Sequence, residues 1–150
     1  MTYSASERLA RAVTDDLNRE ASTFPVSFLA KYDPMPEHDL SDLKTCKLNV
    51  RDTGQRSLGR GTRGWSDYEY DVQVMTYLKI DSSMAAVLSR LKLLAEQFAD
   101  FFMFTSPTDC EETIDRVEVA EFGTDENLKQ MGLARFTMTL VFFGSRERRE

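Results

Sequence analysis

Residues 68–80 read YEYDVQVMTYLKI, and their alternation of apolar and polar side chains predicts a long β-strand around which the fold is built. One face of this strand carries aromatic and branched residues at every second position, namely Tyr68, Tyr70, Val72, Val74, Thr76, Leu78 and Ile80. The opposite face carries Glu69, Asp71, Gln73 and Lys79. We therefore expect a sheet with one covered face and one polar face.

The same two-residue period marks four other segments as strands, residues 24–32, 45–51, 116–122 and 133–143. In the last of these, one face is apolar throughout and consists of Phe136, Met138, Leu140 and Phe142. Val141 and Phe143 place further bulk on the other face. A strand that is apolar on both faces at its end is either sandwiched or lies at an interface. Val141 and Phe143 are therefore candidates for an oligomer interface.

Two helices accompany these strands. Ser4, followed three residues later by Glu7, has the spacing of a capping box and opens an amphipathic helix over residues 5–20. A second helix, with a wide apolar stripe over residues 84–102, ends before Pro107 and suits packing on a sheet. Its cap candidates are Asp81, Ser82 and Ser83.

The order of elements is helix, three strands, helix and two strands, which lacks the alternation of a parallel doubly wound fold. We expect an α+β domain with a mostly antiparallel sheet of about five strands and two helices packed on one face. A chain of 150 residues with 41% hydrophobic content is large enough for one real core. Residues 1–144 would form this single domain, and residues 145–150, SRERRE, a charged and disordered tail.

An arginine- and glycine-rich stretch, QRSLGRGTRGW at residues 55–65, separates the second and third strands. Together with its flanks, near residues 52–66, it is predicted to be a long β-hairpin arm that protrudes from the sheet. Four glycines between residues 54 and 64 favour a mobile backbone that becomes ordered on contact with a partner. The candidate contact residues of this arm are Arg56, Arg60, Arg63 and Trp65.

The arm contains the string GRGTRG, residues 59–64, which matches the G-x-G-x-x-G pattern of dinucleotide-binding loops. That fingerprint needs a strand directly before its first glycine and a helix after its last. Here a strand pattern follows, so we interpret the match as coincidental. The sequence also contains no G-x-S-x-G, H-E-x-x-H or P-loop motif. We therefore expect no catalytic activity and no cofactor.

The single histidine, His38, lies among Glu37, Asp39 and Asp42 in a turn flanked by prolines. A metal site normally takes three or four ligands at defined spacing, so a surface position is favoured over a metal-binding one. Cys46, within a strand pattern, is best explained as a small buried hydrophobe. Two cysteines are too few for a disulfide framework, and the N-terminus lacks the apolar run of a signal peptide. We expect a soluble protein made in a reducing cytoplasm.

The order of these segments resembles that of small proteins encoded among bacteriophage head and tail assembly genes. The segments that carry the resemblance are ERLARAVTDDLNREASTFPVSF, DLSDLKTCKLNVRDTG, RSLGRGTRGWSDYEYDVQV, VLSRLKLLAEQFADFF and ENLKQMGLARFTMTLVF. It covers most of the chain and is one of pattern and order. The glycine density of the arm departs from the family, in which charged and hydrophobic residues occupy the arm.

Within that family the chain is similar to tail terminators, also called tail-completion or neck proteins. The resemblance implies a structural protein that closes the tail tube as a hexameric ring before the capsid docks. It would lie in the neck of the virion and, during assembly, in the host cytoplasm. Its partners would be further copies of itself, the tail tube, and head-completion or connector proteins. DNA would pass through the ring without specific binding, and no membrane would be involved. From the residues themselves, the apolar end of the last strand predicts that self-association runs through sheet edges.

Two other functions stay open. Arg/Gly segments can bind RNA or single-stranded DNA and become ordered on contact, so a nucleic-acid-binding accessory protein is the alternative. The net charge of −6 weighs against it, because such binding depends on phosphate neutralisation by clustered Lys and Arg. Only the arm is locally basic, with no acid between Asp52 and Asp67. A nucleotide-binding enzyme that uses the glycine string is the third possibility.

Overall fold

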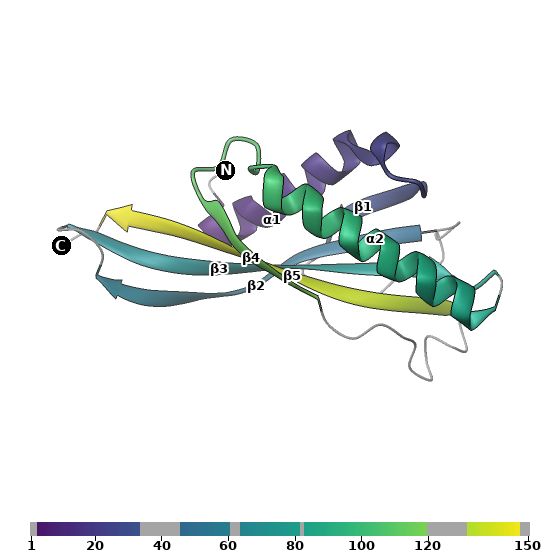
Figure 1. The fold of residues 1–150 in the computed structure, drawn as a ribbon. Helices are drawn as coiled ribbons and strands as arrows, with labels where there is room; N and C mark the ends of the chain where they lie inside the picture. Colours follow the sequence, from purple (N-terminus) through teal and green to yellow (C-terminus); the bar gives the residue numbers. More distant parts are fainter. Residues whose placement is uncertain (1–2, 34–45, 61–63, 82, 120–131, 148–150) are drawn as a thin grey trace.

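The computed structural model describes residues 3–33, 46–60, 64–81, 83–119 and 132–147. They form an α+β fold in which a five-stranded sheet carries two α-helices on one face (Figure 1). This arrangement confirms the predicted fold class. The elements in chain order are α1 (Ala5–Arg19), the short 3-10 helix η1 (Ala21–Thr23), β1 (Phe28–Tyr32), β2 (Cys46–Arg60), β3 (Trp65–Lys79), α2 (Met84–Phe104), β4 (Thr113–Val119) and β5 (Leu133–Glu147).

The sheet order β1-β2-β3-β5-β4 places β3 at the centre. Strands β2 and β3, β3 and β5, and β5 and β4 are antiparallel neighbours, whereas β1 runs parallel to β2. The sheet is therefore mostly antiparallel, as predicted. β3 pairs with β5 from Trp65 to Lys79 and with β2 from Ser66 to Leu78. This central strand is hydrogen-bonded on both sides over nearly its whole length.

Both helices begin at a serine cap. The Oγ of Ser4 accepts a hydrogen bond from the backbone N–H of Glu7 at 3.3 Å, and the Oγ of Ser83 accepts one from Ala86 at 3.3 Å. Each bond satisfies a donor of the first turn that has no partner within the helix. The predicted helix starts are confirmed, and α1 ends at Arg19, one residue before the predicted end.

One apolar core lies between the two helices and the sheet. Its largest fully buried side chains come from α1, α2 and strands β2, β3 and β5, and are Leu9, Leu17, Leu91, Leu94, Phe98, Leu48, Tyr70, Leu78, Phe136, Met138, Leu140 and Phe142. The predicted inward faces of β3 and β5 are thus confirmed. Because burying one such side chain contributes about 1.5–3 kcal/mol, this layer supplies most of the drive for folding. The opposite face of the sheet holds a second small cluster, Met75, Tyr77 and Leu133.

Strand β1 is shorter than its sequence pattern predicts. The alternation begins at Phe24, but η1 occupies the residues just before it and β1 starts at Phe28. Phe24 still faces the core, where its ring lies edge-on at 4.8 Å from that of Phe98. Phe28 makes a similar contact at 5.7 Å. Aromatic packing of this geometry buries the side chain without any strand backbone, which explains why the alternation overestimates the strand.

Asn18 of α1 holds the outer edge of β1. Its Nδ2 donates to the carbonyl of Ala30 at 2.9 Å, and the N–H of Ala30 donates to its Oδ1 at 3.0 Å. The amide side chain therefore takes the place of a neighbouring strand on the side of Ala30 that faces away from β2. A strand edge occupied in this way is a poor template for pairing with another chain.

Strands β2, β3 and β5 extend beyond the rest of the sheet (Figure 1). Strand β1 accompanies β2 only as far as Val50, and β4 accompanies β5 only from Phe143 inward. Past these points three strands continue alone. We call residues 57–60, 65–68 and 144–147 the three-strand end; their register pairs Tyr68 with Ser57 and Gly144, and Ser66 with Arg60 and Arg146.

This geometry does not confirm the arm as a separate hairpin, and it corrects the predicted tail. β2 continues to Arg60 and β5 lies along β3 to Glu147, so the expected arm is part of a three-stranded ribbon over its described residues. Residues 145–147, expected to be disordered, belong to β5, where their backbone pairs with β3, Ser145 donates a hydrogen bond to Asp67 and Arg146 lies over the Tyr68 ring. Residues 61–63 and 148–150 lie outside the described residues, and mobility of the arm stays a prediction.

Gly144 marks a close approach between β5 and the segment that precedes β4. A Cβ atom at this position would lie 2.8 Å from the Cγ of Glu112 and 3.3 Å from Cε2 of Tyr70. The Glu112 carboxylate is buried and accepts a hydrogen bond from the Arg8 guanidinium at 2.5 Å. The absence of a side chain at Gly144 thus allows α1 to be tied to the segment before β4 through an ion pair.

Replacing Gly144 by Val should lower the free energy of unfolding by about 2–4 kcal/mol, because the new side chain displaces Glu112 and leaves a buried charge poorly paired. Urea unfolding followed by circular dichroism measures the change. Gly54→Val is the matched control, since a Cβ at Gly54 meets nothing within 4 Å. Equal losses in the two variants would show that the close approach at Gly144 is unimportant.

Candidate interaction surface

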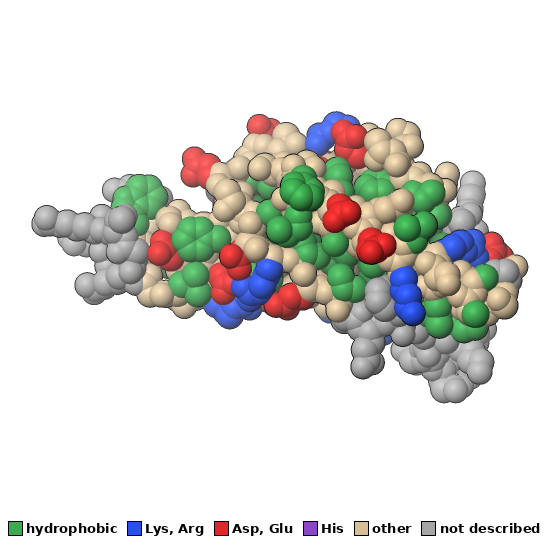
Figure 2. Space-filling model, in the orientation of Figure 1, with side chains coloured by type: hydrophobic (Ala, Val, Ile, Leu, Met, Phe, Trp, Pro, Cys, Tyr) green, Lys and Arg blue, Asp and Glu red, His purple; other side chains and the backbone are tan. Residues whose placement is uncertain are grey.

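The three-strand end exposes large apolar side chains. Leu58 is 50% exposed and Trp65 42% exposed, and Phe143, just inside this end, is 39% exposed. Figure 2 shows hydrophobic side chains on this extension, separated by polar and charged residues from those over α2. A cavity of about 330 Å³ beside Trp65 and Phe143 is also bordered by Gly144 and Glu112. Grouped apolar exposure of this kind is typical of a contact surface.

The two predicted interface residues of β5 fall in different environments. Phe143 is exposed, whereas Val141 is only 1% exposed within the single chain. Val141 therefore cannot be an interface residue in this conformation, and that prediction is wrong. The register places Val141 between Asp71 of β3 and Arg116 of β4. Strand β5 is sandwiched here between side chains from both neighbours.

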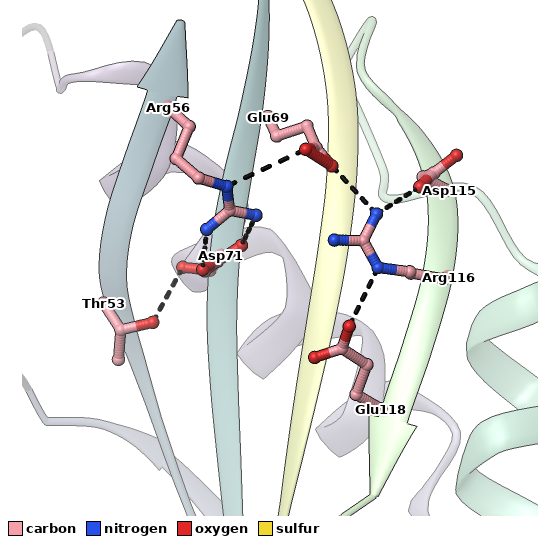
Figure 3. A network of polar contacts seen from close by, with 7 residues as sticks. All are labelled: Thr53, Arg56, Glu69, Asp71, Asp115, Arg116 and Glu118. Carbon is pink, nitrogen blue, oxygen red and sulfur yellow. Dashed lines mark hydrogen bonds and ion pairs between the residues drawn. The ribbon is translucent and has the colours of Figure 1, made fainter. Parts of the chain in front are cut away.

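A network of ion pairs crosses the outer face of the sheet at this level (Figure 3). Arg116 of β4 reaches over β5 and donates to Glu69 of β3 at 2.9 Å. It also donates to Asp115 at 2.7 Å and to Glu118 at 2.9 Å. These hydrogen bonds to carboxylates raise the pKa of the Arg116 guanidinium. The side chain of Arg116 thus connects β4 to the centre of the sheet.

Arg56, a predicted contact residue of the arm, belongs to the same network. Its guanidinium donates to both carboxylate oxygens of Asp71, at 2.6 and 2.9 Å, and lies 3.8 Å from Glu69. Hydrogen bonding to Asp71 raises the pKa of Arg56. This bidentate geometry is the strongest arrangement available to an arginine and a carboxylate. Arg56 is therefore engaged within its own chain.

The other predicted contact residues are placed less completely. Arg60 lies in β2, where its backbone pairs with Ser66, and its side chain lies outside the described residues, as does all of Arg63. The sequence interpretation missed Arg146, whose guanidinium carbon lies 4.0 Å from the centre of the Tyr68 ring. The cue was available: Arg146 continues the alternation of β5 past Phe142.

A second apolar surface lies between α2 and the end of β4, and we call it the α2–β4 groove. It is a wide, open hollow of about 590 Å³, lined by Ser89, Lys92, Leu93, Ala95, Glu96, Ala99 and Val119. Leu93 is 49% exposed and Val119 is 41% exposed. The sequence interpretation took α2 as a core helix, and its buried stripe confirms this. Leu93, directly beside the buried Leu94, is the signal that the helix is apolar on a second side as well.

The sequence offered two places for chemistry, the turn around His38 and the glycine string at residues 59–64. His38, Asp39 and Asp42 lie outside the described residues, among which no cluster of three or more His, Cys, Asp or Glu side chains is arranged to hold a metal. The glycine string runs from β2 to β3, so a strand follows it, as the sequence predicted. Gly59 has a φ of 96°, next to an irregularity in the β2–β3 register.

No protein-family model matches the chain, and a search of curated proteins finds no match. None of the described helices is long and apolar enough to cross a membrane.

Cys46 is buried at 5% exposure, which confirms its assignment as a small hydrophobe, and burial raises the pKa of its thiol from 9.0 to about 12. A raised pKa in the folded state stabilises the protein below the thiol pKa of the unfolded chain, and this contribution is lost as the pH rises. Wild type should therefore lose free energy of unfolding relative to Cys46→Ala between about pH 9 and pH 12. Denaturant titrations at stepped pH measure the difference, and parallel pH profiles would contradict it.

Proposed function

We propose that this chain is a structural assembly protein of the bacteriophage neck, which closes the end of the tail as a ring and takes part in the head–tail junction. The observation that carries the proposal is the three-strand end, which extends beyond the helices and exposes Leu58 and Trp65. Beyond Tyr68, which packs against the core, the described apolar side chains of this extension are exposed. Its exposed side chains suit contact with a neighbouring subunit.

The sheet edges support contacts through side chains rather than through strand pairing. Asn18 occupies the outer edge of β1 at Ala30. The other edge strand, β4, has a register irregularity before Arg116 and carries alternating charges there. Both features are known to protect edges against pairing with another strand. The expectation that the ring forms through sheet edges is therefore replaced by one in which exposed side chains make the contact.

The partners follow from the resemblance and stay proposals. They are further copies of the chain, six in a closed ring, together with the tail tube and head-completion or connector proteins. DNA would pass through the ring, and the net charge of −6 weighs against tight binding, because an acidic protein as a whole repels phosphates. In this proposal the protein acts in the virion neck and is assembled in the host cytoplasm. The absence of enzymatic activity also stays a prediction.

The nucleic-acid-binding alternative is weakened by the ion-pair network. The sequence suggested three available arginines in the arm, but Arg56 donates to Asp71 and lies close to Glu69. Around Arg56 and Arg116 the network contains four carboxylates, Glu69, Asp71, Asp115 and Glu118. Two cations against four anions repel a phosphate backbone. The nucleotide-binding enzyme is disfavoured because β3, not a helix, follows the glycine string.

The purified protein should form a closed oligomer whose mass reaches a plateau as concentration rises, six chains by the resemblance. Light scattering coupled to size-exclusion chromatography, with sedimentation velocity as a second method, measures this. Replacing Arg60 and Arg63 together by Ala, with Arg56 and its ion pair to Asp71 left intact, should leave the subunit folded and reduce assembly. A chain that stays monomeric at every concentration, and in any particle containing it, would rule the proposal out. Strong binding of single-stranded DNA would favour the alternative instead.

A further inference from the structure

The cavity beside Trp65 combines aromatic walls with negative charge. Its volume is about 330 Å³, and Trp65 and Phe143, both exposed, supply the aromatic rings. Glu111 and Glu112 line the same cavity, and no lysine or arginine of the described part of the chain does. Aromatic rings attract cations through the negative charge of their faces, and carboxylates attract them directly. The composition of this cavity therefore favours a positively charged group.

The two carboxylates of the cavity differ in their engagement. Glu112 is buried and accepts a hydrogen bond from the Arg8 guanidinium at 2.5 Å, so its charge is compensated within the chain. Glu111 is exposed, and it makes no hydrogen bond or ion pair with any residue that the structure describes. Glu111 is thus the negative charge that is left for a ligand.

The edge of β5 adds backbone acceptors to the cavity. β4 accompanies β5 outward only to the pair of Thr113 with Phe143, whereas β5 continues to Glu147. Beside Gly144 and Ser145, which line the cavity, none of the described strands lies on the side of β5 that faces away from β3. A strand edge of this kind presents carbonyl oxygens as hydrogen-bond acceptors. A ligand with several N–H donors can therefore be bound by this edge and by Glu111 together.

Arginine is the cation that suits these features best. Its guanidinium is planar, stacks on aromatic faces, carries five N–H donors and is weakly hydrated, whereas the ammonium of lysine is a strongly hydrated point charge. Tryptophan and arginine are also the residues most enriched at the energetic centres of protein interfaces.

We propose that the cavity beside Trp65 binds an arginine side chain of a protein partner. The guanidinium stacks on the indole of Trp65 and donates hydrogen bonds to the Glu111 carboxylate. This inference names the chemistry of a partner of the three-strand end. It rests on the proposed neck function only for the question of which protein supplies the arginine.

Fluorescence of the free subunit tests the site directly, because Trp65 is the only tryptophan of the chain. Titration with N-acetyl-arginine amide should change this fluorescence in a saturable way, with a dissociation constant that is roughly millimolar. The citrulline analogue has nearly the same shape without the charge and should give no saturable change, and the lysine analogue should bind more weakly. A response to citrulline or lysine that equals the response to arginine overturns the proposal.

Variants locate the site. Glu111→Gln removes the charge and should raise the dissociation constant about two- to fivefold, and Phe143→Ala should also raise it. Glu96→Gln is the matched control, because Glu96 is an exposed glutamate on α2 outside this cavity, and it should bind like wild type. Arginine should shift the amide NMR signals of Gly144 and Ser145. Equal binding by wild type and Glu111→Gln, or shifts only at other residues, would exclude this site.

The outcomes separate this inference from the proposed function. If arginine binds as described but the protein never assembles, the neck function fails and the arginine site stands. If the protein forms a ring but binds arginine no better than citrulline, the site fails and the function stands.

Discussion

The fold depends on the double pairing of β3. With β2 on one side and β5 on the other, the backbone groups of this strand are satisfied without help from water. Its inward side chains then form the floor on which both helices pack, with Tyr70 and Leu78 almost completely buried. The same pairing continues as far as Trp65, past the level at which β1 stops accompanying β2. The core and the three-strand end are thus two consequences of one long strand.

The outer face of β3 carries two neighbouring negative charges. Glu69 and Asp71 follow each other along that face of β3, where like charges destabilise a sheet. Arg56 from β2 and Arg116 from β4 approach from opposite sides and share Glu69 between them (Figure 3). Because these groups are partly exposed, each pair contributes modestly to stability. Their larger effect is on geometry, since they connect three strands across β5 and cover Val141.

Much of the fold follows from local patterns in the sequence. Alternation locates β3 and the inward face of β5, and serine caps locate both helix starts, because these signals act within a few residues. The parallel pairing of β1 with β2 is not predictable in this way, since it depends on contacts between distant segments. Asn18 illustrates the difficulty. Its hydrogen bonds to the edge of β1 are made with Ala30, twelve residues away, and no local sequence pattern predicts them.

At the three-strand end, too, some features can be recognised from the sequence and others depend on contacts between distant segments. Trp65 and Phe143 could be recognised from sequence, because a large apolar residue at the end of a strand pattern is conspicuous. The burial of Val141 could not, because Arg116, which crosses β5 beside it, comes from a different strand. The sequence predicted that Arg56 is available to a partner. This was wrong because its carboxylate partner, Asp71, lies on the neighbouring strand and not beside it in the sequence. With Arg56 satisfied internally, the described part of this end still exposes Leu58 and Trp65, and such apolar side chains favour a protein neighbour over a phosphate backbone.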